Sequence, residues 1–367
     1  MAARAAPPPL AEGTKLKDYT LKRRLGTGSM GEVYEAVHAV TGRRVAIKVL
    51  KHGVDQALNA SRRLLEEARV VNAIRHPGIV DVFDVGVYGE RRPYLVMELL
   101  EGRSLAERLT ADGRPPLDEA LWLLAGILEA LAAAHQAGVI HRDLKPSNVF
   151  LLNESPGPAQ VKLLDFGVAR REGREEQLTA PEMAVGSVGY MAPEQLMGQA
   201  VAASDLYAVG CLAFQLLAGR PVFPLKNIPE AARRHLTEPA PKLRTVRPEA
   251  SELLEGWVAM LLEKDVAARP RTAEAALRAL DAVRAELTPV GDPKTEPSLS
   301  RSPALSSFIR ANKRTEVVPA FEPPSGGGSA ATKGPVPALD TGERPTAREH
   351  DTRALQEAPG DKTLLDS

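Results

Sequence analysis

The chain has 367 residues, of which 44% are hydrophobic, so it is long enough to bury a sizeable core. Lysine plus arginine and aspartate plus glutamate number 47 each, and this balance gives no overall charge that would favour nucleic acid or a membrane surface. Cys211 is the single cysteine, which excludes an intrachain disulfide and a cysteine-based metal site, and we expect it to fill a buried helix.

The N-terminal residues 1–15 are predicted to be a flexible leader. Prolines occupy positions 7–9, where a signal peptide would need its apolar centre. No apolar run reaches the ~18 residues that a membrane-spanning helix needs, and the run Leu121–Leu128 is ended by Glu129, as is typical of a core helix. We therefore expect a soluble, cytoplasmic protein without membrane insertion.

The first candidate site is the glycine-rich sequence at residues 26–31, Gly-Thr-Gly-Ser-Met-Gly. Glycine allows the backbone to approach phosphate oxygens that a Cβ would hold away. The motif alone also fits a dinucleotide-binding protein, in which the glycines open a helix after a strand. Here the β-rich runs 33–37 and 45–50 flank a turn at Thr41 and Gly42, which predicts a hairpin and disfavours that alternative.

Helices are predicted over three later segments. Residues 61–71 have helical apolar spacing and contain the adjacent Glu66 and Glu67. A second helix covers residues 118–136, and a final helix covers residues 273–287 with Thr272 as its cap. His76 and His135 are interpreted as a turn residue and a helix-end residue.

The C-terminal segment, residues 288–367, has a different composition. Proline, serine, threonine, glycine and charged residues dominate, and Phe308 and Phe321 are its only aromatic residues. Such a segment buries too little apolar surface to offset its ordering entropy. We predict a disordered tail with no second folded domain.

The most informative motif is residues 141–148, His-Arg-Asp-Leu-Lys-Pro-Ser-Asn, followed seventeen residues after its end by Asp-Phe-Gly at 165–167. It sets an aspartate, a lysine, an asparagine and a second aspartate in the order that phosphoryl transfer from ATP requires. Together with the glycine-rich loop and the sequence Val-Ala-Ile-Lys at 45–48, these residues resemble the Hanks-type, eukaryotic-like serine/threonine protein kinase family. The abundant alanine, arginine and proline and the lack of an apolar span indicate a bacterial member of the soluble type.

The resemblance implies an α+β, bilobal protein kinase fold. The strand-rich small lobe would cover residues 16–97, the hinge residues 98–102 and the helical large lobe residues 103–287. It implies ATP and Mg²⁺ as cofactors and protein substrates with serine or threonine acceptors, with no nucleic acid as partner.

The resemblance also implies residue roles. Asp143 would be the catalytic base, and Lys145 would lie beside the γ-phosphate. Asn148 and Asp165 would hold Mg²⁺. Lys48 would bind the α- and β-phosphates and pair with a glutamate of the next helix. Counting back from His76-Pro77 favours Glu67 over Glu66 for this partner. The nucleotide would be contacted by Leu25, Gly26, Gly28, Gly31, Val33, Ala46, Lys48, Met97, Glu98, Leu100 and Phe150.

Several large-lobe residues match structural positions of the family. Asp205 would bond the backbone of the catalytic loop, and Glu194 would form a buried ion pair with Arg269. Ser187 stands where most relatives have threonine, which keeps the hydroxyl and loses a methyl group. Lys145 and the segment 186–194 resemble the serine/threonine branch.

Three function classes fit this pattern to different degrees. An active protein kinase is favoured because every phosphate, metal and base position is filled. A pseudokinase scaffold is the alternative, although it usually lacks the lysine or one of the aspartates. A small-molecule kinase is disfavoured by the segment 192–194 and the helix start at Asp205. By the resemblance, Arg142 would meet a phosphorylated residue of the activation segment, which runs from Asp165 to Glu194. Thr179 would be the autophosphorylation site, unless it is an ordinary exposed loop residue or Glu175, Glu176 or Glu182 supplies the negative charge.

Overall fold

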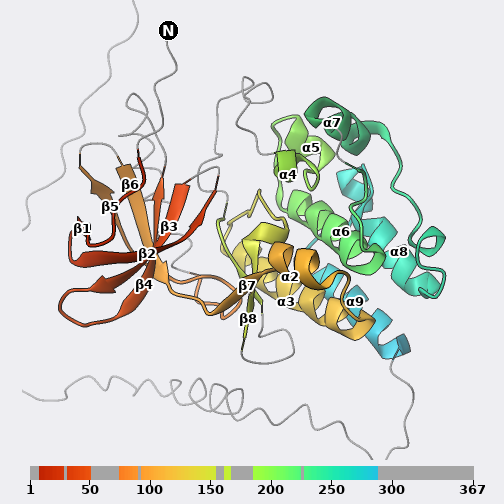
Figure 1. Ribbon diagram of the computed structural model, residues 1–367. Coiled ribbons are helices and arrows are strands. Elements are labelled where there is room, and N and C mark those ends of the chain that lie inside the picture. The colour runs from red at the N-terminus through yellow and green to blue at the C-terminus, as the bar shows by residue number, and fades with distance from the viewer. Residues whose placement is uncertain are drawn as a thin grey trace, which may run out of the picture. The chain divides into compact units, whose positions relative to one another are not determined.

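The computed structural model describes residues 8–28, 31–50, 74–89, 92–153, 161–166, 185–224 and 227–287. Strands dominate the first part of this range and helices the second (Figure 1). The predicted helix over residues 61–71, with Glu66 and Glu67, lies outside the described residues. Thr179 and the predicted tail, residues 288–367, also lie outside them.

The small lobe is built on an antiparallel sheet of six strands in the order β1-β2-β3-β4-β6-β5. The predicted hairpin is confirmed, because β3 pairs with β4 and places Tyr34 opposite Ile47. Tyr34, Ile47 and Val96 are buried in the core of this lobe. The strands are β1 (Lys15–Leu16), β2 (Tyr19–Thr27), β3 (Gly31–His38), β4 (Arg44–Leu50), β5 (Val82–Tyr88) and β6 (Arg92–Glu98).

The described part of the predicted leader, residues 8–14, is bonded to this sheet. The backbone N–H of Leu10 donates to the hydroxyl of Tyr34 at 2.9 Å, and Arg92 donates to the carbonyl of Pro8 at 3.1 Å. Leu10 also packs against the small-lobe core. A flexible leader that runs to residue 15 therefore does not describe these residues. The proline run prevents a helix, but it does not prevent contacts with a neighbouring sheet.

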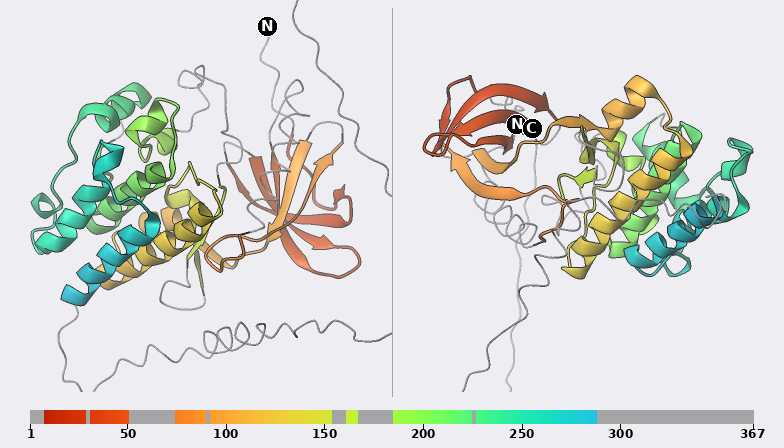
Figure 2. Two further views of the ribbon diagram at one scale, coloured as in Figure 1. Left: turned by 180° about the vertical axis from the view of Figure 1, so that it is seen from behind. Right: turned by 90° about the horizontal axis from the view of Figure 1, so that it is seen from below.

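The large lobe is a group of helices around α3. This helix contacts α6, α9 and β9, so it is buried on more than one face (Figure 2). Its apolar run is therefore a core helix, as predicted, and Leu124 and Ile127 are fully buried. The helices are α2 (Leu105–Asp112), α3 (Leu117–Gln136), α4 (Val185–Val188), α5 (Pro193–Leu196), α6 (Ala202–Ala218), α7 (Ile228–Thr237), α8 (Glu252–Leu261) and α9 (Ala273–Leu287).

The ends and contacts of these helices follow from local sequence. The final helix begins as predicted, with Thr272 Oγ1 accepting from the backbone N–H of Ala275 at 3.2 Å. In α6, a Cβ on Gly210 would lie 2.9 Å from Cβ of Leu261, so glycine is needed for the close approach of α8. Cys211, the next residue, is buried in α6 as predicted.

A three-stranded sheet, in the order β7-β8-β9, is formed by one strand that precedes α2 and two strands that follow α3. Its strands are β7 (Gly102–Ser104), β8 (Val149–Leu152) and β9 (Val161–Leu163). The N–H of Leu163 donates to the carbonyl of Gly78 at 2.8 Å, and the N–H of Val80 donates to the carbonyl of Leu163 at 3.1 Å. These bonds fix β9, and the residues that follow it, against a segment of the small lobe.

Among the helices that the structure describes, none combines the length and the hydropathy that crossing a bilayer requires.

The predicted ion pair between Glu194 and Arg269 is confirmed. Two parallel bonds join the guanidinium to the carboxylate, at 2.7 and 2.8 Å, and the Arg269 side chain is fully buried. Burial alone would raise the pKa of Glu194, but the bonds from Arg269 and Ser204 outweigh it and lower this pKa below its ordinary value of 4.5. The stabilisation is therefore present above about pH 4.5 and is lost as the pH falls through the lowered pKa.

Replacement of Arg269 should destabilise the fold strongly, because it leaves the Glu194 carboxylate buried without its cation. We expect Arg269→Ala to lower the free energy of unfolding by about 3–5 kcal/mol in urea denaturation at pH 7. Arg284→Ala is the matched control: its pair with Asp281, at 3.2 Å, is solvent-exposed and should contribute less than ~1 kcal/mol. Equal effects of the two substitutions would contradict a stabilising role for the buried pair.

Candidate active site

The centre of the site is a short loop and 3₁₀ turn between α3 and β8. Asp143 is buried, with 5% of the residue exposed, and its carboxylate accepts from Lys145 Nζ at 2.8 Å and from Asn148 Nδ2 at 3.1 Å. Asn148 Nδ2 also donates to the Asp143 carbonyl at 2.8 Å. Lys145 Nζ donates in addition to Ser187 Oγ at 2.7 Å, so the hydroxyl that Ser187 retains bonds the lysine of this loop. These contacts hold the carboxylate in one orientation.

The loop is anchored to the helical core by Asp205, in the first turn of α6. Its carboxylate accepts from the backbone N–H of His141 at 2.8 Å and of Arg142 at 2.9 Å, as predicted. Its Oδ2 atom also lies 2.8 Å from His135 Nε2. His135 is thus more than the ordinary helix-end residue that the sequence suggested. No local pattern could indicate this contact, because it joins residues of two helices.

His141 connects this loop to the segment that follows β9. Its Nε2 atom lies 2.9 Å from the carbonyl oxygen of Leu164, and its Nδ1 accepts from the N–H of Asp143 at 3.3 Å. The ring packs against Phe166, with centroids 4.7 Å apart. Burial lowers the pKa of His141, so the ring is neutral and donates through Nε2 to Leu164.

Two residues of the site have left-handed backbones. Arg142 has φ 63° and Asp165 has φ 51°, a region that non-glycine residues seldom adopt. Backbone strain of this kind persists where surrounding contacts impose it, often at functional sites. For Arg142, the two bonds to Asp205 supply that constraint.

A second acidic group lies close to the small lobe. Lys48 Nζ, on β4, is 2.6 Å from Asp165 Oδ2, so this ion pair joins the two lobes. The predicted partner of Lys48, Glu67, lies outside the described residues, so the choice between Glu67 and Glu66 stays a prediction.

The glycine-rich loop leaves space beside these groups. The N–H of Gly28 donates to the carbonyl of Gly31 at 2.8 Å, which closes the loop. A Cβ on Gly31 would lie 2.3 Å from the Val49 carbonyl oxygen, so packing requires glycine there. A Cβ on Gly26 would meet no atom within 4 Å. The space at Gly26 therefore remains open to a ligand.

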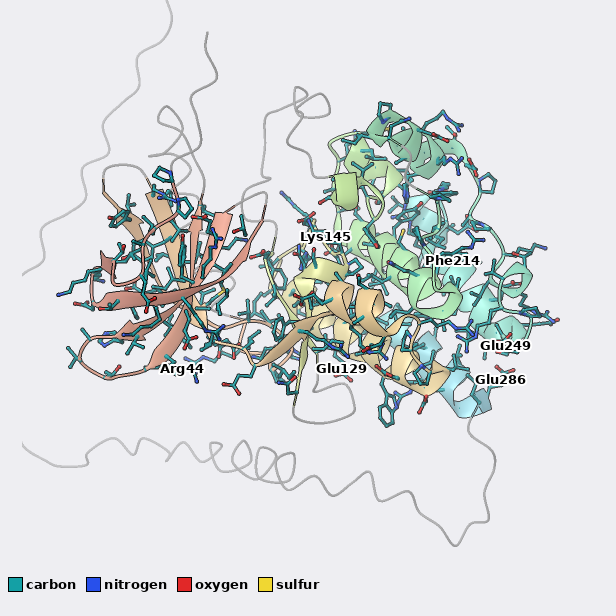
Figure 3. The ribbon with its side chains drawn as sticks, viewed as in Figure 1. Arg44, Glu129, Lys145, Phe214, Glu249 and Glu286 are labelled. Carbon is teal, nitrogen blue, oxygen red and sulfur yellow. The ribbon has the colours of Figure 1, made fainter. Side chains whose placement is uncertain are left out.

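One cavity of about 610 Å³ brings most of these residues together. Of the predicted site residues, its lining includes Gly28, Gly31, Val33, Lys48, Asp143, Lys145, Asn148 and Asp165. Figure 3 shows Lys145 on the side of the helical lobe that is nearest to the six-stranded sheet. The cavity thus joins glycine backbone, two ammonium groups and two carboxylates, which can bind a phosphate chain with its metal ion.

The other predicted nucleotide contacts do not line this cavity. Ala46 lies opposite Met97 in the ladder of β4 and β6. The N–H of Glu98 donates to the carbonyl of Asp81 at 3.0 Å, and its carboxylate accepts from Lys162 at 2.5 Å. The backbone N–H of Glu98 is therefore already bonded within the small lobe. The predicted contacts outside the cavity lining are Leu25, Gly26, Ala46, Met97, Glu98, Leu100 and Phe150.

The donor set near Asp165 fits a magnesium ion. Asn148 uses its amide nitrogen to bond Asp143, which leaves its amide oxygen as the atom for a metal. Mg²⁺ prefers oxygen ligands and is commonly held by one or two protein groups together with substrate phosphates. In the part of the chain that the structure describes, three or more acidic, histidine or cysteine side chains nowhere cluster as a metal site. Asn148 and Asp165 would thus supply two oxygen ligands, and substrate phosphates and water would supply the others.

The cavity also includes residues that sequence reasoning missed. It continues beyond Ser187 to Tyr190, to α2 and to the end of α6, where Gln215 and Gly219 line it. The hydroxyl of Tyr190 donates to Gln215 Oε1 at 2.5 Å. No motif could indicate this extension, since it depends on how α2 packs near the end of α6.

The chain matches known proteins over most of this region. The protein kinase domain family matches residues 19–279. The chain is 38% identical over 297 residues to the serine/threonine-protein kinase Pkn1 of Myxococcus xanthus. The aligned part is 79% of this chain and 42% of Pkn1. It is 38% identical over 292 residues to PknA of Mycobacterium tuberculosis, and this aligned part is 78% of this chain and 66% of PknA. The chain thus spans less than two thirds of the length of these two relatives.

The fold has a counterpart among solved structures. The kinase domain of PknI from Mycobacterium tuberculosis superposes with a TM-score of 0.60 at 28% identity, and it covers 76% of this chain and all of that domain. With a six-stranded sheet, a helical lobe and a family match over residues 19–279, the chain belongs to the protein kinase family.

Proposed function

We propose that this chain transfers the γ-phosphate of ATP to serine or threonine hydroxyls of proteins, with Mg²⁺, and that it phosphorylates itself as well. The observation that supports this proposal most is the bonded set around Asp143, in which Lys145, Asn148 and Ser187 hold one carboxylate in place. Its relatives are named as serine/threonine kinases. A cytoplasmic location remains a prediction from the sequence.

Asp143 is the proposed base. Its carboxylate would orient the acceptor hydroxyl and take up its proton as the oxygen attacks phosphorus. A base in this position must be fixed, since a small misplacement costs much of the rate. The bonds from Lys145 and Asn148 supply that restraint.

Lys145 is proposed to stabilise the transferred phosphoryl group. An ammonium group has three N–H donors, and two of them bond Asp143 and Ser187. The third would donate to a phosphate oxygen, where negative charge accumulates in the transition state. One lysine would thus link the base, the activation segment and the phosphate.

Lys48 and the glycine-rich loop are proposed to hold the triphosphate. Backbone N–H groups of the loop would approach the phosphate oxygens, while Lys48 neutralises their charge. Mg²⁺, when bound by Asn148 and Asp165, would neutralise developing charge between the phosphates. The 2.6 Å pair between Lys48 and Asp165 supports a position of both groups at the same end of the cavity.

Removal of the Asp143 carboxylate should abolish most of the turnover. For Asp143→Ala we expect kcat to fall by about 10²–10⁴-fold, roughly 3–5 kcal/mol, with ATP affinity nearly unchanged. Phosphate incorporation into a generic basic protein measures kcat, and a fluorescent nucleotide measures binding. Asp281→Ala, a surface change, is the matched control. Near-normal turnover of Asp143→Ala would contradict the role of the base, whereas a lack of turnover in wild type would favour a pseudokinase scaffold.

The two glutamates of the segment 61–71 should differ in effect. Glu67→Gln should lower kcat by misplacing Lys48, whereas Glu66→Gln should leave it within about two-fold of wild type. Lys48→Met should abolish transfer while the far-ultraviolet circular dichroism stays unchanged. If Glu66→Gln is the damaging variant instead, the predicted helix register is wrong by one residue.

A further inference from the structure

The cavity is longer than the phosphate-binding part of the site requires. Beyond Asp143 and Ser187 it is lined by residues of α2, the loop after it, the activation segment and the end of α6. An acceptor hydroxyl must reach Asp143 from the side that the triphosphate does not occupy. This outer part of the cavity, lined by Ala106, Leu109, Thr110, Gly113, Arg114, Gly186, Tyr190, Gln215 and Gly219, is therefore where the protein substrate would lie.

The outer part has one charged side chain among its described lining residues. That residue is Arg114; the carboxylates of the cavity, Asp143 and Asp165, both lie at its catalytic end. A basic substrate side chain would thus meet no carboxylate among the described residues of the outer part. An acidic side chain would meet the Arg114 guanidinium.

The contacts of Arg114 leave its charge uncompensated within the described residues. Its side chain is exposed, and none of the described carboxylates lies within ion-pair distance of it. Its one hydrogen bond, to the carbonyl of Leu217 at the end of α6, is long at 3.4 Å. Arg247 already donates to the same carbonyl at 3.1 Å, so this acceptor is satisfied without Arg114.

The surroundings of Arg114 are electropositive. Arg247 is buried, and burial and then the nearby charge of Arg114 lower the pKa of its guanidinium. One carboxylate, Glu249, lies 3.2 Å from Arg247. Two guanidinium groups with one carboxylate attract a further anion, and an anionic side chain of a bound protein would supply it.

A continuous set of contacts connects the base to Arg114. Lys145 bonds Ser187 at 2.7 Å, and Tyr190 bonds Gln215 at 2.5 Å. Gly219 follows Gln215 by about one helical turn, ~5–6 Å. A Cβ on Gly219 would lie 3.6 Å from Cβ of Arg114. Because an extended chain rises about 3.3 Å per residue, Arg114 is several substrate residues away from the acceptor.

We propose that Arg114 is a specificity-determining residue that selects an aspartate or glutamate several residues from the phosphorylated serine or threonine. This inference rests on the proposed kinase function and adds a substrate class to it. A purely structural role for Arg114, as a second partner for the end of α6, makes a different prediction: its replacement would alter stability and leave substrate preference unchanged.

The test uses the full-length chain and serine peptides that differ at one position. Glutamate, glutamine or lysine is placed at each position three to six residues on either side of the acceptor, and kcat/KM is measured for each peptide. At one or two positions, wild type should prefer glutamate to lysine by about three- to five-fold, the upper part of the range for one exposed ion pair. Arg114→Glu should reverse that preference, Arg114→Lys should keep it, and KM for ATP should not change in either.

Arg278→Glu is the matched control, because it makes the same charge change at an exposed position of α9 that does not line the cavity. It should keep the wild-type preference. Equal kcat/KM for glutamate and lysine peptides at every position, or an unchanged preference in Arg114→Glu, would overturn the proposal while the kinase function stood. If wild type phosphorylates neither these peptides nor a generic protein, the proposed function fails and the inference fails with it.

Discussion

The active site depends on a single buried carboxylate, that of Asp205. It is 1% exposed, and a buried charge is tolerated only where donors satisfy it. Here the backbone N–H groups of His141 and Arg142 and the ring of His135 surround it at 2.8–2.9 Å. Its place in the first turn of α6 adds the favourable field of a helix N-terminus. These bonds impose the left-handed backbone of Arg142 and thereby set the direction in which Asp143 leaves the loop.

Other parts of the site extend from this anchor. Lys145 connects the loop to Ser187, and Gln195, in the following segment, donates to the carbonyl of Arg142 at 2.5 Å. The same segment is also bonded to the helical lobe by the buried ion pair between Glu194 and Arg269. The catalytic loop, residues 187–195 and the helical core are thus bonded as one unit, while the small lobe contacts it through Lys48 and the strand pairing at β9.

Local sequence predicted the features that depend on local physics. The β-rich runs on either side of Thr41 and Gly42 indicated the β3–β4 hairpin, and Thr272 marked the start of the last helix. The motif at 141–148 placed the loop residues, because residues a few positions apart in one short loop lie close together in space. Contacts between distant segments could not be predicted in this way. Leu10 bonds a tyrosine of β3, and the outer part of the cavity is lined by residues of α2 and of the end of α6, which are far apart along the chain.

The central claim is that Asp205 positions the catalytic loop, and Asp205→Asn tests it most directly. The amide keeps the size of the side chain but removes its charge and turns one acceptor into a donor that faces backbone N–H groups. Steady-state kcat should fall at least ten-fold, with ATP binding retained and the urea unfolding midpoint showing that the chain is folded. A folded variant with the kcat of wild type would contradict the account.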